Sequence, residues 1–312
     1  MVQSPNIPPT TLQTRISPLA SQLTHKVHTY LENSWTFSSE KYKCAFFAMD
    51  FPRLLALFCP DGPLDRLESS ALFVCLTGIL DDAFSQMSID EARNIGKKLL
   101  AIMQGQVPAD ASNPLEKIIG KIIDDLKSQG GNAQLAEDVI DGAIALFIAQ
   151  TAKERLGLMQ LDEYFVFRHH DVGGGFFTAM IRFVNNIMLT PAQLSEFEAL
   201  ENTTVRHMIL VNDILSWEKE IKEARESNQE GSAVCSAVPI LARNLGVGYD
   251  GAKRILWASC RELEGSFGDL AVDVLGRLKG GNLAEGKRYI EALEYLASGN
   301  EEWSRTTSRY RS

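Results

Sequence analysis

Apolar residues recur along most of the chain at intervals of three and four positions, the spacing of one face of an α-helix. Runs that alternate strictly between apolar and polar residues, as half-buried strands do, are absent. Polar connectors at 105–114, 224–232 and 244–251 separate the periodic stretches. The pattern therefore predicts an all-α chain. Its expected helices cover residues 17–32, 39–58 (broken at Pro52), 64–84, 88–103, 114–129, 132–157, 160–186, 191–224, 233–245, 249–279 and 283–298.

Residues 1–16 lack this helical pattern. They are rich in Pro, Thr, Ser and Gln, a composition that buries little apolar surface, so we expect a disordered segment. Residues 17–312 contain no internal repeat and no linker long enough to separate two domains. With 312 residues, the chain can bury one large core, and we expect a single α-helical domain over 17–312.

Composition narrows the class of protein. The chain is 45% hydrophobic with a net charge of −9, which argues against a nucleic-acid partner. An anionic substrate is still compatible with this charge, because bound metal ions can invert the local field. The five cysteines form no paired motif and indicate a reducing compartment. No signal peptide and no membrane-spanning stretch is recognisable, so a cytoplasmic protein is expected.

The stretch 211–220, VNDILSWEKE, carries candidate metal ligands. Asn212, Ser216 and Glu220 stand four residues apart, so a helix places them on one stripe. Amide, hydroxyl and carboxylate oxygens are hard ligands that suit Mg²⁺ shared with phosphate and water. Lys219 lies about 100° around the helix from Glu220, and its side chain could reach a phosphate oxygen near the metal. Taken alone, the stripe could also be an ordinary solvated face.

A second candidate lies at the end of an apolar helix. From residue 67 the chain reads LESSALFVCLTGILDD, which is apolar on most sides and ends in Asp81 and Asp82. Acids at a helix C-terminus oppose the helix dipole, at a cost of about 0.3–1 kcal/mol each. A bound cation would reverse that cost. The alternative is that the pair simply marks where the helix reaches solvent.

Four motifs together resemble those of class I terpene cyclases, in particular fungal sesquiterpene cyclases of the aristolochene synthase kind. The family's D-D-x-x-D/E motif stands here as Asp81-Asp82-Ala83-Phe84-Ser85, with Ser85 in place of the last acid. The others are N-D-x-x-S-x-x-x-E at 212–220, Arg168 placed 44 residues before Asn212, and the terminal pair Arg309-Tyr310. The resemblance runs from about residue 20 to 310.

The resemblance implies an all-α bundle that encloses an apolar cavity and cyclises farnesyl diphosphate with release of diphosphate. Three Mg²⁺ ions are expected with diphosphate bound: Asp81 would ligate two of them, and Asn212, Ser216 and Glu220 the third. The diphosphate would be held by Arg168, Lys219, Arg309 and Tyr310. The partner is thus an isoprenoid diphosphate, and a homo-oligomer is possible. The expected catalytic set is Asp81, Arg168, Asn212, Ser216, Glu220, Arg309 and Tyr310.

The cation formed in this chemistry needs a dry aromatic pocket. Trp303, Phe58 and Phe147 are the candidates, although an aromatic residue at helical spacing is more often part of the core. Gly78 stands one turn before Asp81, where aristolochene synthases tend to carry an aromatic residue. We therefore expect a larger or reshaped cavity there and a product other than aristolochene.

Several alternatives stay open at this point. In isolation, Arg168 could form a surface salt bridge with Asp171, and Arg309 could belong to a frayed basic tail. The glycines at 173–175 could be a tolerated kink rather than a functional helix break. In function, the alternatives are a diterpene cyclase acting on geranylgeranyl diphosphate and a non-catalytic isoprenoid-binding helical protein. A chain-elongating enzyme is disfavoured because its second aspartate-rich motif is missing.

Overall fold

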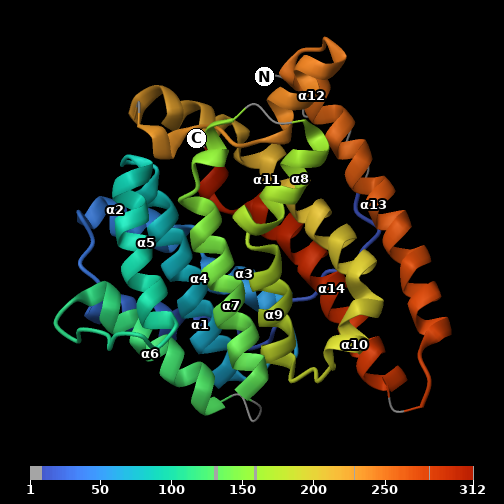
Figure 1. Cartoon of the computed structure of the whole chain (residues 1–312), viewed down its shortest axis with the longest axis horizontal. Coiled ribbons are helices and arrows are strands. Elements are labelled where there is room, and N and C mark those ends of the chain that lie inside the picture. Colours follow the sequence, from blue (N-terminus) through green and yellow to red (C-terminus); the bar gives the residue numbers. More distant parts are fainter. Residues whose placement is uncertain (1–8, 130–132, 158–159, 228, 281, 312) are drawn as a thin grey trace.

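The structure is a computed structural model that describes residues 9–129, 133–157, 160–227, 229–280 and 282–311. Every regular element in these residues is helical, as the sequence predicts. In Figure 1, α13 lies along one side of the bundle, α5 and α6 on the opposite side, and α4, α7, α9 and α14 between them. The α-helices are α1 (Ala20–Ser34), α2 (Glu40–Ala48), α3 (Phe51–Phe58), α4 (Leu64–Phe84), α5 (Ile89–Met103), α6 (Pro114–Gln129), α7 (Ala133–Gln150), α8 (Leu161–Asp171), α9 (Gly174–Asn185), α10 (Pro191–Leu194), α11 (Glu198–Ser227), α12 (Ala237–Leu245), α13 (Tyr249–Arg277) and α14 (Asn282–Thr306). Short 3₁₀ turns are η1 (Lys153–Leu156), η2 (Ser195–Phe197), η3 (Glu230–Ser232) and η4 (Ser308–Tyr310).

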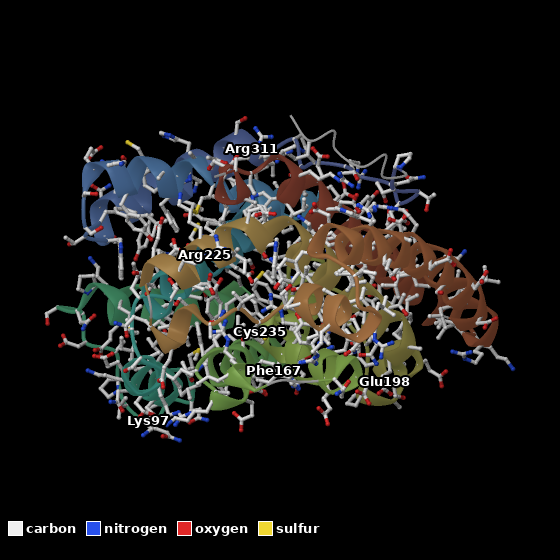
Figure 2. All side chains as sticks on the ribbon, turned by 90° about the horizontal axis from the view of Figure 1, so that it is seen from above. Lys97, Phe167, Glu198, Arg225, Cys235 and Arg311 are labelled. Atoms are coloured by element: carbon white, nitrogen blue, oxygen red, sulfur yellow. The ribbon has the colours of Figure 1, made fainter. Side chains whose placement is uncertain are left out.

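Two apolar clusters hold the bundle together. The larger one contains residues of α1, α3, α4, α6, α7, α9 and α14, and the smaller one lies between α8, α11, α12 and α13. Helix α11 contributes to both, with Met208 in the larger cluster and Ile209 in the smaller. Polar side chains such as Lys97 and Glu198 lie on the outside (Figure 2). The helix with the oxygen-bearing stripe is therefore fixed by packing on two sides.

The expected disordered segment is only partly covered by the structure. Its residues 1–8 lie outside the described residues. Residues 9–16 follow the surface of α13 and α14, where Thr10 Oγ1 donates a hydrogen bond of 2.8 Å to Glu264. Polar groups of residues 9–16 thus find partners on both helices, and the disorder expected for residues 1–16 stays a prediction.

The expected helix 39–58 is broken earlier than predicted. The break falls at Met49 and Asp50, and Asp50 adopts the left-handed conformation with φ of 54°. The Asp50 side chain accepts from the backbone N–H of Arg53 at 3.3 Å and caps α3. Pro52 lies in the first turn of α3, where its missing N–H has no intrahelical partner to lose.

Several other helix boundaries moved. The expected helix 160–186 is divided into α8 and α9 at Gly173, whose φ of 81° is accessible mainly to glycine. Helix α7 ends at Gln150, and residue 132 of its expected range lies outside the described residues. The range 191–224 divides into α10, η2 and α11, and α12 starts at Ala237 rather than at residue 233.

The last helix is longer than the sequence indicated. We expected it to end at residue 298, before Gly299, but α14 continues to Thr306. A side chain at Gly299 would lie 3.0 Å from Cβ of Leu57 on α3, so the glycine allows the two helices to approach closely. Its role is packing rather than termination. The extension carries Trp303 and the terminal Arg309-Tyr310 pair to the centre of the bundle.

The contact between α7 and α9 provides a test of this packing. An alanine Cβ at Gly142 of α7 would lie 2.6 Å from the backbone Cα of Phe176 on α9. We expect Gly142→Ala to lower the free energy of unfolding by about 1–3 kcal/mol, because backbone cannot move aside cheaply.

The matched control is Gly268→Ala, at an exposed position of α13 where no atom lies within 4 Å of the new methyl group. That change should raise stability by up to about 1 kcal/mol through helix propensity. Urea denaturation followed by circular dichroism measures both. Equal effects of the two substitutions would contradict the close packing of α7 on α9.

Candidate active site

A cavity of about 190 Å³ lies among α3, α4, α7, α8, α9, α11 and the C-terminal segment. Its wall includes apolar side chains such as Leu54, Val74 and Leu146. The polar residues expected to bind metal or diphosphate are also in this wall, whereas Asp82 is not among its lining residues. The expected residues are Asp81, Arg168, Asn212, Ser216, Lys219, Glu220, Arg309 and Tyr310. Residues separated by more than 200 positions in sequence are thus gathered around one space.

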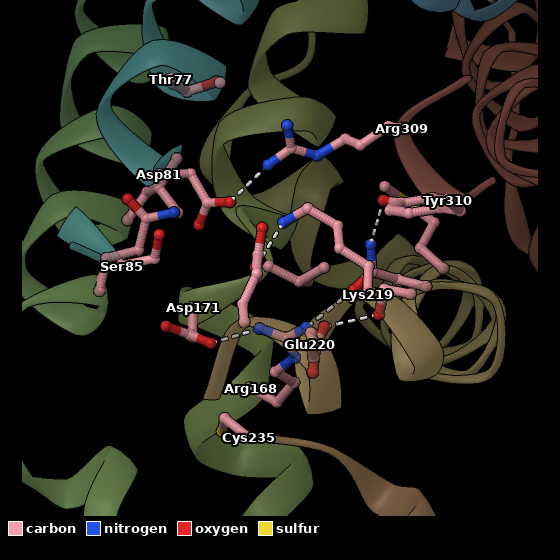
Figure 3. A pocket seen from close by; sticks show the side chains of 18 of the residues that line it. Thr77, Asp81, Ser85, Arg168, Asp171, Lys219, Glu220, Cys235, Arg309 and Tyr310 are labelled. Carbon is pink, nitrogen blue, oxygen red and sulfur yellow. Dashed lines mark hydrogen bonds and ion pairs between the residues drawn. The ribbon is translucent and has the colours of Figure 1, made fainter. Parts of the chain in front are cut away.

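The acidic end of α4 is paired with the C-terminal segment. Arg309 Nη2 lies 2.7 Å from Asp81 Oδ2 and 2.9 Å from Asp82 Oδ1, and Figure 3 shows Asp81 and Arg309 pointing at each other. Tyr42 donates a hydrogen bond of 3.0 Å to Asp82. Burial raises the pKa of Asp81, but Arg309 and Lys219 outweigh it and leave that pKa lowered. The side chain of Arg309 is 6% exposed, so it does not belong to a frayed tail.

Ser85 stands where the family motif has its last acid. It is the C-terminal cap of α4, and its hydroxyl donates to the backbone carbonyl of Asp82 at 2.9 Å. Ser85 also belongs to the cavity wall. The hydroxyl therefore faces the same space as Asp81, while its hydrogen bond stabilises the end of the helix that presents that acid.

The stripe of Asn212, Ser216 and Glu220 on α11 lines the cavity on the side opposite the acidic end of α4. Ser216 Oγ donates to Glu220 Oε1 at 2.5 Å, and Lys219 lies 2.8 Å from Glu223. Burial raises the pKa of Glu220, although Arg168 and the Ser216 hydroxyl act in the opposite direction. Figure 3 shows Asp81 on α4 and Glu220 on α11 on opposite sides of the space. The stripe is therefore a cavity wall and not a solvated face.

Arg168 is buried and joins three segments. Its Nη1 pairs with Asp171, and its Nη2 donates to Asn212 Oδ1 at 2.8 Å. The amide of Asn212 in turn donates to the hydroxyl of Tyr310 at 2.9 Å. The salt bridge with Asp171 that we considered as an alternative exists, but it is buried and continues to α11 and η4. Burial raises the pKa of Tyr310 to about 12, so its hydroxyl stays protonated at neutral pH.

Asp213 is a site residue that sequence reasoning missed. It accepts from the hydroxyl of Tyr164 at 2.5 Å and from the backbone N–H of Ala237 at 2.8 Å, and Arg168 lies 3.4 Å away. Burial raises the pKa of Asp213 to about 7 despite the charge of Arg168. Its position next to Asn212 is visible in the sequence, but only the fold shows that its carboxylate forms an ion pair with Arg168.

The aromatic residues of the wall differ in part from the expected set. Trp303 lines the cavity, and its indole N–H donates to the carbonyls of Met49 and Asp50 at 3.0 and 3.1 Å. Phe58 and Phe147 are buried but are not among the lining residues. Phe177, which does line the cavity, meets the ring of Phe58 edge-on with centroids 5.5 Å apart. Phe58 and Phe147 thus belong to the core, and Phe51 and Phe177 replace them in the wall.

The expected extra space at Gly78 is filled by Phe51. A Cβ on Gly78 would lie 2.6 Å from Cε2 and Cζ of the Phe51 ring. That ring is stacked on Trp303 with centroids 5.4 Å apart. The missing side chain at Gly78 therefore reshapes the wall instead of enlarging the cavity, because a ring from α3 occupies the position.

A second group of metal-ligand side chains lies outside the cavity. His207 Nε2 lies 3.3 Å from Glu264 and 3.5 Å from Glu301. Arg261 pairs with both acids, and Arg305 lies 2.7 Å from Glu301. Burial raises the pKa of Glu301, but hydrogen bonds from His207 and the arginines outweigh it and lower that pKa to about 2. The two arginines supply the positive charge that an ion would bring, so we assign no metal site here.

Among the described residues, no helix is both long and apolar enough to cross a bilayer.

His169 and His170, which follow Arg168 in sequence, are not among the lining residues. The described lining residues of the cavity include no histidine that could act as a base.

Comparison with known proteins agrees with this geometry. Residues 72–265 match the family described as terpene synthase family 2, C-terminal metal binding. The chain is 32% identical to an aristolochene synthase of Aspergillus terreus, over 97% of this chain and 93% of the relative. It is 31% identical to a (+)-aristolochene synthase of Penicillium expansum, over 97% and 91% of the two chains.

Solved structures show the same fold. The crystal structure of aristolochene synthase from Penicillium roqueforti matches with a TM-score of 0.81 and 28% identity, covering 97% of this chain and 100% of that one. Germacradien-4-ol synthase from Streptomyces citricolor matches with a TM-score of 0.79, covering 96% and 98%, but its 15% identity supports the fold alone. The expected all-α class I fold is confirmed. The chain belongs to terpene synthase family 2 and is a metal-dependent sesquiterpene cyclase of the aristolochene synthase kind.

Proposed function

We propose that the protein ionises farnesyl diphosphate in the presence of Mg²⁺ and cyclises the resulting cation to a sesquiterpene, with release of diphosphate. One observation carries this proposal. Oxygen ligands on α4 and α11 and the cationic side chains Arg168, Lys219 and Arg309 line one cavity whose wall also contains apolar and aromatic side chains. The similarity to aristolochene synthases supports a C15 substrate such as farnesyl diphosphate.

The donor atoms fit Mg²⁺ in kind. Asp81 offers a carboxylate, and Asn212, Ser216 and Glu220 offer amide, hydroxyl and carboxylate oxygens on one stripe. We expect three ions with diphosphate bound, two at Asp81 and one at the stripe. Bound there, Mg²⁺ would act as a Lewis acid that neutralises the charge of the departing diphosphate.

Arginine suits the diphosphate because its guanidinium forks onto two oxygens and stays charged at neutral pH. Arg168 of α8 and Arg309 of η4 both line the cavity, and Lys219 of α11 adds a further positive charge to its wall. The hydroxyl of Tyr310 is protonated at neutral pH and can donate to the diphosphate. These four residues would bind and orient the diphosphate above the apolar part of the cavity.

The hydrocarbon part of the substrate would lie against Phe51, Phe177 and Trp303. An aromatic face stabilises a nearby cation by about 0.5–2 kcal/mol. The indole N–H of Trp303 is already bonded to two backbone carbonyls, which fixes the orientation of the ring. A rigid aromatic wall would exclude water and restrict how the cation folds.

Two alternatives remain as outcomes of the test. A diterpene cyclase would convert geranylgeranyl diphosphate, and a non-catalytic protein would bind isoprenoid diphosphates without releasing diphosphate. The charged network that lines the cavity favours turnover over mere binding. A cytoplasmic location and a homo-oligomeric state stay predictions.

The test is incubation with Mg²⁺ and farnesyl diphosphate, followed by gas chromatography of the extract and measurement of released diphosphate. We expect a cyclic C15 product that disappears with EDTA. Glu220→Gln should lower the rate at least about 100-fold, because loss of a ligand costs more than loss of an outer hydrogen bond. Glu218→Gln is the control, since Glu218 on the same helix is exposed and pairs with Lys253.

The helical circular dichroism of both variants should match that of the unchanged protein. Full activity of Glu220→Gln would contradict the metal assignment. Product from geranylgeranyl diphosphate alone would identify a diterpene cyclase. Binding without any release of diphosphate would identify the non-catalytic alternative.

The contact of Gly78 with Phe51 gives a separate prediction about product choice. Gly78→Ala forces the Phe51 ring to move, because the new methyl group would lie 2.6 Å from it. A methyl-sized change in an apolar pocket alters discrimination by about 10- to 200-fold. We therefore expect the ratio of hydrocarbon products to change at least about tenfold, while Mg²⁺-dependent diphosphate release changes far less.

Gas chromatography of the extracts measures the ratio, and the double variant Phe51→Leu with Gly78→Ala is the control. A smaller side chain at Phe51 leaves room for the methyl group, so Gly78→Ala should have little further effect in that background. An unchanged product ratio in the single variant would show that the ring does not shape the cavity.

A further inference from the structure

The cavity wall contains a fourth cationic side chain, Arg155, which no motif identifies. It belongs to η1, the short turn between α7 and α8, and it lines the same space as Arg168, Lys219 and Arg309. Its side chain is 15% exposed. A largely buried guanidinium needs partners for its donors, because an uncompensated buried charge is costly.

The protein supplies few of those partners. An arginine has five N–H donors, and Arg155 uses Nη1 for one hydrogen bond of 3.2 Å to the carbonyl of Gln150. Its Nε is inaccessible to water and makes no hydrogen bond to any described residue. The carboxylate of Asp171 lies 3.5 Å from Nε, which is an ion pair without a hydrogen bond. Within the part of the chain that the structure describes, most of the hydrogen-bonding capacity of Arg155 is therefore unused.

The nearby carboxylate is already engaged. Asp171 Oδ2 accepts from Arg168, while Oδ1, which is nearest to Arg155, makes no hydrogen bond. One carboxylate thus stands between two guanidinium groups, and Arg168 has the shorter contact. Arg155 therefore shares its ion-pair partner with Arg168, and its remaining N–H donors can serve an anion in the cavity.

Arg155 lies in the same cavity as the acidic end of α4. Asp81 of α4 and Arg155 of η1 both belong to the residues that line it. Asp81 and Arg155 therefore face the same space. An anion that lies next to ligands on α4 would be within the reach of this guanidinium.

We propose that Arg155 is a further diphosphate-binding residue, which donates from η1 to the diphosphate of the isoprenoid substrate. This inference rests on the proposed function, because it requires that a diphosphate occupies the cavity. Arg155 would share that anion with Arg168, and Asp171 would hold the two guanidinium groups side by side. The turn η1 thereby becomes part of the substrate site.

The test compares Arg155→Gln with the unchanged protein by isothermal titration with inorganic diphosphate in the presence of Mg²⁺. We expect the dissociation constant to rise about 10- to 150-fold, the range for one charge-assisted hydrogen bond. The KM for farnesyl diphosphate should rise in the same direction. The melting temperature, measured in parallel without ligand, reports any purely structural effect.

The matched control is Arg93→Gln. Arg93 of α5 also donates to a carbonyl in the stretch after α7, that of Thr151 at 3.1 Å, but it is not among the lining residues. Its loss should leave the affinity for diphosphate within about twofold, a free-energy change below that of a typical hydrogen bond. An equal loss in the two variants would mean that Arg155 acts only through the fold of η1 and would overturn the proposal.

Two outcomes separate this inference from the proposed function. If the unchanged protein does not bind diphosphate with Mg²⁺, the proposed function itself fails. If it binds and Arg155→Gln binds equally well, only the role of Arg155 is wrong. Should Arg155→Gln not fold, Arg155→Lys decides: it keeps the charge but loses the fork, so affinity should fall several-fold, and unchanged affinity would overturn the proposal.

Discussion

Ion pairs between distant segments set the geometry of the charged end of the cavity. Arg309 ties the C-terminal turn to Asp81 at the end of α4, and Arg168 ties α8 to Asp213 on α11. The pair of Arg168 with Asp213 is buried, and loss of one partner from such a pair typically costs about 3–5 kcal/mol. The pair of Arg309 with Asp81 contributes less, because the Asp81 side chain is 45% exposed and water screens it. Each pair therefore restrains two elements at once. The residues proposed to bind substrate also fix the positions of α4 and α11, the helices that carry the metal ligands.

The pairs can do this only because apolar packing keeps α4 and α11 in the interior. Helix α4 is buried on most sides, and α11 lies between the larger and the smaller apolar cluster. Both helices end their buried stretch at the cavity, where Asp81 meets Arg309 and Glu220 meets Ser216. The hydrophobic effect thus places the charges, and the ion pairs then fix their orientation.

Much of the fold could be predicted from helical periodicity, and the ligand stripe could be predicted because its spacing is local to one helix. Asp81, Asn212 and Arg309 were recognised from motifs that are specific in combination. Arg155 and Asp213 were missed because their roles depend on contacts between segments, which no local pattern records. Phe58 and Phe147 were candidates for the wall, whereas the lining residues include Phe51 and Phe177, and no local pattern shows which of several core aromatic rings reaches a cavity.

Helices α4 and α11 are proposed to hold divalent cations on two sides of one diphosphate, two ions at Asp81 and one at the stripe of Asn212, Ser216 and Glu220. Anomalous diffraction from crystals grown with Mn²⁺ and inorganic diphosphate would locate these ions, because Mn²⁺ takes the same oxygen ligands as Mg²⁺. We expect anomalous peaks about 2.0–2.3 Å from the oxygen ligands of Asp81 and of the stripe, with diphosphate between them. Peaks only at the cluster of His207, Glu264 and Glu301, or none beside Glu220, would contradict the proposal.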